Sequence, residues 1–148
     1  MLELTDFLIE KHVTLIYWDL NKSHQLILPF FQNETEVKVI KDIEELWEWN
    51  KAVTVKYLIL GIKKKEKLEE IKNELRKVPI DQRRKLFIIY ISPHLETLNR
   101  LQAFLYEANL VVNTKDLKDL DKIINKSRIY WEALYKPFNK ALEQIEKD

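Results

Sequence analysis

Short apolar runs alternate along this chain with longer stretches that carry apolar residues at helical spacing. Two runs, Val55–Leu60 and Leu86–Ile91, are apolar, β-branched and aromatic, as is typical of central strands covered on both faces. We interpret three further runs, Val13–Trp18, Thr35–Ile40 and Leu110–Val112, as strands of the same sheet. Strands that alternate with helices form a mainly parallel sheet, so the sequence predicts an α/β fold.

Helices are predicted between these strands. Asp42 stands three residues before Glu45, which is the spacing of a capping box at a helix start. Residues 64–77 carry an apolar stripe that runs on to Val78 and ends before Pro79. Its members are Leu68, Ile71, Leu75 and Val78. The same spacing in residues 95–108 predicts a helix with one apolar face, made of Leu98, Leu101, Phe104 and Leu105.

Two other stretches are less regular. Residues 21–33 fit either a helix or a strand, and Pro29 argues against a long helix there. Residues 116–147 continue a helical pattern for about thirty residues, with a bend expected near Pro137 because an interior proline removes a backbone hydrogen bond. We expect one domain over 1–148, with an N-terminal helical segment (1–11), a core (12–127) and a C-terminal helical extension (128–148).

The chain contains a single glycine, Gly61, and no cysteine among its 148 residues. Phosphate-cradling loops need several glycines, so both the P-loop and the G-x-G-x-x-G fingerprint are excluded. Without cysteine there is no disulfide framework and no thiolate metal site. His12, His24 and His94 are too scattered to match a known metal-ligand spacing, so we expect neither a metal nor a cofactor.

The 25 basic and 24 acidic side chains nearly balance, which gives no general attraction to nucleic acids or acidic membranes. The first eleven residues carry acids within their apolar stretch and no cleavage site, so they do not resemble a signal peptide. No apolar run approaches the roughly 20 residues that span a bilayer. We therefore expect a cytoplasmic protein, whose many lysine, isoleucine and glutamate residues are typical of a thermophile.

The order and spacing of these elements over residues 12–127 resemble the receiver domain of two-component response regulators. The resemblance implies a flavodoxin-like three-layer sandwich with strand order 2-1-3-4-5 and, here, an extended C-terminal helix. Residues 83–120 are also similar to uncharacterised bacterial receiver-like proteins, which often follow a cysteine zinc ribbon. That ribbon is absent from this sequence, because it contains no cysteine.

The resemblance implies a phosphorylation site at the carboxyl ends of the strands. In receivers, two acids after the first strand hold Mg²⁺ and an Asp after the third accepts the phosphoryl group. A hydroxyl follows the fourth strand and a Lys follows the fifth. The matching positions here are Trp18 and Asp19, then Gly61, then Ser92, then Asn113 with Lys115 two residues later.

Because glycine has no group to phosphorylate, these residues predict a degenerate receiver pocket. We interpret the chain as a non-catalytic pseudo-receiver that acts as a protein-interaction or signalling module. An alternative is a ligand- or nucleotide-sensing or hydrolytic domain that uses Asp19, Ser92 and Asn113 at the edge of the sheet. Asp19 and Ser92 equally suit helix caps, and no group is evident that would orient His94 beside Ser92.

Residues 63–85 hold ten basic and five acidic side chains. They offer a second alternative, nucleic-acid binding through phosphate contacts. The acids at helical spacing favour an ordinary solvated helix face laced with ion pairs instead. The basic patch would comprise Lys63, Lys64, Lys65, Lys67, Arg83 and Arg84.

An apolar stripe continues into the C-terminal extension, and such a stripe requires a partner to cover it. The alternatives are packing on its own domain, including the N-terminal segment, and packing against a second copy or another protein. We expect an interaction surface at Tyr130, Trp131, Tyr135 and Phe138, with a homodimer through this helix as one outcome.

Overall fold

The computed structural model describes residues 12–83, 85–130 and 133 of the chain. One sheet has the order β2-β1-β3-β4-β5, and every pair of neighbouring strands is parallel. The predicted flavodoxin-like fold class and strand order are therefore confirmed. The strands are β1 (His12–Asp19), β2 (Glu36–Ile40), β3 (Thr54–Ile62), β4 (Phe87–Ile91) and β5 (Leu110–Val112).

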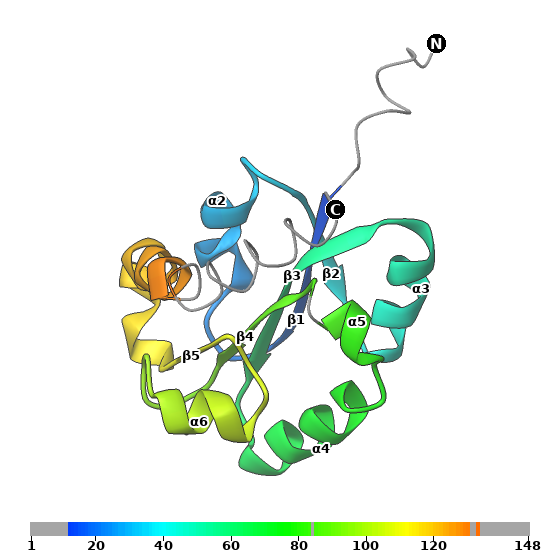
Figure 1. Ribbon diagram of the computed structural model, residues 1–148. Coiled ribbons are helices and arrows are strands. Elements are labelled where there is room, and N and C mark those ends of the chain that lie inside the picture. The colour runs from blue at the N-terminus through cyan, green and yellow to red at the C-terminus, as the bar shows by residue number, and fades with distance from the viewer. Residues whose placement is uncertain (1–11, 84, 131–132, 134–148) are drawn as a thin grey trace.

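Helices cover both faces of this sheet (Figure 1). The short and long helices are η1 (His24–Leu26), α2 (Leu28–Phe31), α3 (Glu44–Ala52), α4 (Lys65–Leu75), α5 (Ile80–Arg83), α6 (Arg100–Leu105) and η2 (Thr114–Asp119). Residues 120–130 continue from η2 as the helix that we call the C-terminal helix. One core cluster joins the sheet to α3, α4 and α6, and a second joins it to α2 and the C-terminal helix. The result is a three-layer sandwich.

The capping box and the apolar helix face predicted for the first half of the chain are both present. The Glu45 N–H donates to Asp42 Oδ1 (3.3 Å), and the Glu45 carboxylate accepts from the Asp42 N–H (3.2 Å), which are the two bonds of a capping box. The apolar stripe of α4 is buried against the sheet. Residues 21–33 form η1 and α2 rather than a strand, and Pro29 lies in the first turn of α2, where its missing N–H costs nothing.

The prediction for residues 95–108 is wrong in two respects. The helix is short, because α6 covers only Arg100–Leu105, and its expected apolar face points to solvent. Leu101 is 67% exposed and Phe104 is 79% exposed. The face that packs on the core instead carries Ala103 and Tyr106.

The physical reason for this difference is the helix start at Asn99. Its side chain accepts the Gln102 N–H (2.9 Å), which is a strong N-cap, so the helix begins after residue 99 rather than at residue 95. Leu98, just before the cap, has a φ of 61° and therefore lies outside the helix. The position of the cap determines which residues of α6 face the sheet. The leucine spacing across residues 98–105 does not determine this.

The C-terminal helix is tied to the sheet by a cluster around Glu34. Both carboxylate oxygens of Glu34 accept from the Arg128 guanidinium (3.2 Å each), and one of them also accepts from Lys56 Nζ (3.1 Å) and from the Tyr57 hydroxyl (3.2 Å). Partial burial acts to raise the pKa of Glu34, but the hydrogen bonds and charges of Lys56 and Arg128 outweigh it and lower that pKa. The cluster joins three segments that are distant in the sequence.

The remaining expectations for the ends of the chain lie outside the described residues. These are the N-terminal helical segment, the bend near Pro137 and most of the extension over 128–148. The first part of the predicted last helix differs from expectation, because Thr114–Asp119 is a 3-10 helix. No helix in the described part of the chain is long and apolar enough to cross a membrane. The cytoplasmic location and the thermophilic origin stay predictions.

Candidate functional site at the carboxyl edge of the sheet

Five of the six predicted site residues lie at one edge of the sheet, because the carboxyl ends of parallel strands all meet there. Trp18 and Asp19 end β1, and Gly61 lies one residue before the end of β3. Ser92 and Asn113 follow directly after β4 and β5. The register of the sheet places Trp18 directly beside Gly61 on the neighbouring strand.

The Trp18 indole fills the space next to Gly61. A Cβ built on Gly61 would lie 2.5 Å from Cε3 of this indole, far inside normal carbon contact. Gly61 has no positive φ, so its backbone conformation does not require glycine and the packing of the indole does. The other side of the ring is held by a hydrogen bond from Nε1 to the Lys22 carbonyl (2.6 Å).

Ser92 is fully buried, and its hydroxyl is engaged in its own turn. The Ser92 Oγ accepts from the His94 N–H (3.3 Å), while the Ser92 N–H donates to the Val112 carbonyl (3.0 Å). The serine therefore closes a local turn, and the expectation that it caps the fourth helix is wrong, because Asn99 is the N-cap of α6.

The Asn113 amide is engaged in the same way. Its Oδ1 accepts from the Lys115 N–H (3.0 Å) and caps η2, and its Nδ2 donates to the Leu95 carbonyl (2.9 Å). The Asn113 N–H donates to Thr97 Oγ1 (2.8 Å), and that hydroxyl donates to the Asp116 carboxylate. The sequence did not predict a role for Thr97 or Asp116. The two residues are nineteen positions apart, and no sequence pattern indicates that they are in contact.

Two of the predicted residues remain apart from this cluster. Asp19 and Lys115 are both exposed. The Asp19 carboxylate forms no hydrogen bond or ion pair with the described residues, and Ser23 rather than Asp19 caps the first helix, η1. The loop after β1 reaches η2 through a different residue, because Lys22 Nζ lies 3.5 Å from the Thr114 carbonyl. Among the described residues, no group of three histidine, aspartate or glutamate side chains is arranged to hold a metal ion.

Solved structures share this architecture. No family model matches the sequence, and no curated protein matches it. The CheY-like protein TadZ from Pseudomonas aeruginosa PAO1 superposes with a TM-score of 0.57 at 14% identity, covering 77% of this chain and 98% of that one. The orphan response regulator HP1043 of H. pylori gives 0.51 at 13% identity, covering 79% and 95%.

A response regulator from Thermotoga maritima gives a TM-score of 0.51 at 10% identity, covering 80% of this chain and 98% of that one. This chain has a receiver-like fold. The likeness at such low identity concerns the fold alone, so the chemistry has to be judged from the residues at the sheet edge. In the receiver-like fold, the position that the resemblance assigns to the phosphoacceptor is occupied here by Gly61.

The described basic residues of the segment 63–85 lie at two edges of the sheet. Lys63, Lys64 and Lys65 are exposed and follow β3 at the carboxyl edge. Arg83 precedes β4 at the opposite edge and pairs with Glu107 (2.6 Å). Lys67 pairs with Glu70 (3.1 Å), whose hydrogen bond raises the pKa of the lysine, and Arg84 lies outside the described residues.

Of the predicted interaction surface, only Tyr130 lies within the described residues. It is 39% exposed on the C-terminal helix, and the Arg100 guanidinium carbon lies 4.3 Å from its ring centroid. Trp131, Tyr135 and Phe138 lie outside the described residues. The role of these three aromatic residues stays a prediction.

Proposed function

We propose that this chain is a non-phosphorylatable pseudo-receiver that acts through protein contacts in signalling rather than as an enzyme. The observation that carries the proposal is the contact between Trp18 and Gly61. Glycine offers no carboxylate to a phosphoryl donor, and the indole occupies the space where an acceptor side chain would extend. A receiver-like fold without its acceptor retains surfaces for binding but not the group that reacts.

The other positions support the same proposal. Phosphoryl transfer to a carboxylate requires a divalent cation held by oxygen ligands and a fixed positive charge near the transferred group. Of the carried-over acid pair only Asp19 is present, since the other position is Trp18. The position of the lysine is Asn113, whose side-chain amide is bonded to Leu95 and Lys115.

The two alternatives receive less support from the same geometry. A ligand site built on Asp19, Ser92 and Asn113 requires side chains that are free to meet a ligand. Ser92 is fully buried, and Asn113 already uses both ends of its amide. Nucleic-acid binding requires a continuous basic surface, whereas the described lysines and arginines of residues 63–85 divide between two edges of the sheet.

Phosphorylation is the direct test. The purified chain is incubated with acetyl phosphate and Mg²⁺, and its intact mass is measured beside that of an active receiver treated identically. We expect a phosphoryl adduct on the active receiver and none on this chain. A stoichiometric adduct that maps to an acidic side chain at the sheet edge would refute the proposal.

The protein partner is proposed to be contacted through the C-terminal aromatic residues Tyr130, Trp131, Tyr135 and Phe138, with a second copy of the chain as one candidate. Light scattering tests the homodimer directly. We expect twice the chain mass for the wild type and a monomer for Phe138→Glu. A wild-type monomer at high concentration would leave a heterologous protein as the partner and would contradict the homodimer.

A further inference from the structure

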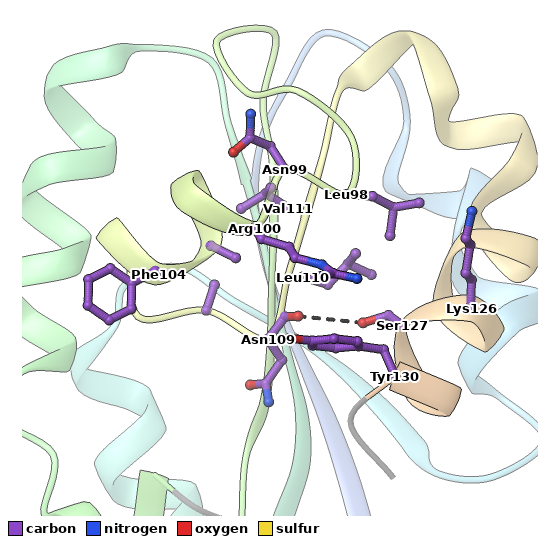
Figure 2. Close-up of a pocket in the computed structure, with 12 residues that line it drawn as sticks. Leu98, Asn99, Arg100, Phe104, Asn109, Leu110, Val111, Lys126, Ser127 and Tyr130 are labelled. Carbon is purple, nitrogen blue, oxygen red and sulfur yellow. Dashed lines mark hydrogen bonds between the residues drawn. The ribbon is translucent and has the colours of Figure 1, made fainter. Parts of the chain in front are cut away.

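A cavity of about 490 Å³ lies away from the carboxyl-edge positions, between α6, β5 and the C-terminal helix (Figure 2). Its volume falls within the roughly 300–1,000 Å³ typical of small-molecule sites. The accessible apolar lining comes from the α6 side, from Leu98, Ala103 and Phe104. Leu110 and Val111 of β5 form the floor beneath it and are at most 2% exposed, so they offer little surface to a ligand.

The charged side chains around this floor are all positive among the described lining residues. Arg100 comes from α6 and Lys126 comes from the C-terminal helix, on the opposite wall. No aspartate or glutamate is among the described residues that line the cavity. Within the described part of the chain, neither cation forms an ion pair, so both are available to an anion.

Arg100 is also held in a defined direction. Figure 2 shows its side chain extending from α6 toward the C-terminal helix, where its guanidinium carbon lies 4.3 Å from the Tyr130 ring centroid. Stacking on an aromatic face uses the plane of the guanidinium and leaves its N–H edges available to a carboxylate. The wall that carries Tyr130 is fixed nearby, since Ser127 Oγ lies 3.5 Å from the Asn109 carbonyl.

We propose that this cavity binds a small amphipathic organic anion, with an aromatic or aliphatic body against the apolar side chains of the α6 wall and one carboxylate between Arg100 and Lys126. The apolar wall supplies burial, and the two cations supply charge complementarity and orientation. The site is independent of the carboxyl-edge residues and does not rest on the proposed function.

A matched pair of probes separates charge from burial. The full chain, labelled with ¹⁵N, is titrated with 2-naphthoate and with 2-naphthamide, which keeps the rings but removes the charge. We expect naphthoate to shift the amide signals of residues 98–111 and 126–130. We expect naphthamide to bind about thirty-fold more weakly, because it loses the charge-assisted contacts to both Arg100 and Lys126.

Variants assign this effect to the two cations. Arg100→Gln is expected to weaken naphthoate binding about ten-fold and to leave naphthamide binding unchanged. Lys126→Gln is expected to weaken naphthoate binding about three-fold. Lys41→Gln, which removes an exposed lysine after β2, is the control and is expected to change neither. Ala103→Leu, which narrows the cavity from α6, is expected to weaken both probes.

Several results would overturn the proposal. Equal affinities for the two probes, or an unchanged naphthoate affinity in Arg100→Gln, would remove the anion-binding role. Shifts confined to the solvent-facing side of α6, or no binding of either probe, would remove the site. Shifts of the cavity residues on dilution without a probe would identify the groove as a contact between copies. Arg100 is exposed, so Arg100→Gln is expected to fold. The test therefore stays valid even if Ala103→Leu fails to fold.

Discussion

Gly61→Ala tests the contact that carries the functional proposal. The substitution adds a single carbon 2.5 Å from Cε3 of the Trp18 indole and 2.9 Å from its Cδ2 and Cζ3. Carbon atoms in contact normally lie about 3.5–4.0 Å apart, so the ring has to move by roughly 1 Å. The backbone cannot supply this movement cheaply, because Trp18 and Gly61 lie side by side in the β1–β3 ladder.

The expected cost follows from three contributions. Forcing a methyl group into packed space costs about 2 kcal/mol, and displacing the indole strains its hydrogen bond to the Lys22 carbonyl, worth about 1 kcal/mol. Replacing a strand glycine by alanine stabilises the folded state by roughly 1 kcal/mol, because alanine loses less backbone entropy on folding. We therefore expect the free energy of unfolding to fall by about 2 kcal/mol, and the melting temperature by roughly 4–8 °C for a domain of this size.

A double-mutant cycle isolates the indole as the cause. Urea unfolding, followed by far-UV circular dichroism, is measured for wild type, Gly61→Ala, Trp18→Ala and the double variant. Without the indole, Gly61→Ala is expected to stabilise by roughly 0.5–1 kcal/mol, so the coupling energy reaches about 2.5–3 kcal/mol. Trp47→Ala removes a different half-buried tryptophan and should leave the cost of Gly61→Ala unchanged. A coupling energy below about 0.5 kcal/mol would refute the reasoning.

Three further substitutions test other parts of the fold. Tyr90→Phe should raise the free energy of unfolding by about 1 kcal/mol in thermal melts, because the buried hydroxyl has no partner among the described residues; a clear loss would reveal one. Glu34→Gln should lower the free energy of unfolding by about 1 kcal/mol at pH 7. Since Lys56 and Arg128 hold the pKa of Glu34 below its ordinary 4.5, this difference should persist above pH 4.5 and vanish as the pH falls below it; a pH-independent difference would contradict the ion-pair explanation. Phe104→Ser should leave the melting temperature within about 1 °C, since the ring is 79% exposed, whereas a large fall would place it in the core.

The strands were predictable because their signal is local. A run of β-branched and aromatic residues covered on both faces is a strand wherever it occurs, and the five predicted runs differ from the observed strands by at most two residues at an end. The face of α6 was not predictable from apolar spacing. The short helix exposes its leucine and phenylalanine residues and packs the half-buried Ala103 against the core, so its composition indicates the wrong side.

The carboxyl edge shows the same division between local and long-range information. That Gly61 follows the apolar run of β3 was visible in the sequence, and so was the absence of a carboxylate at that position. That the Trp18 indole packs on it depends on the parallel register of β1 and β3, which joins residues more than forty positions apart. No spacing rule along one strand contains this contact, so only the assembled sheet explains why the glycine is needed.

Position 61 therefore lacks two separate things: a carboxylate, and the space that a carboxylate side chain would need beside Trp18. An aspartate placed at position 61 alone would meet the indole at its Cβ, because the first side-chain carbon already lies within 2.5 Å of Cε3. Restoring a carboxylate therefore requires that Trp18 change as well, and each change alone leaves either a clash or an empty space. Because of this mutual dependence, no single substitution at position 61 places a carboxylate at this edge without a clash. The cations on the α6 side depend on no such pair, so binding at that cavity can vary independently of the sheet edge.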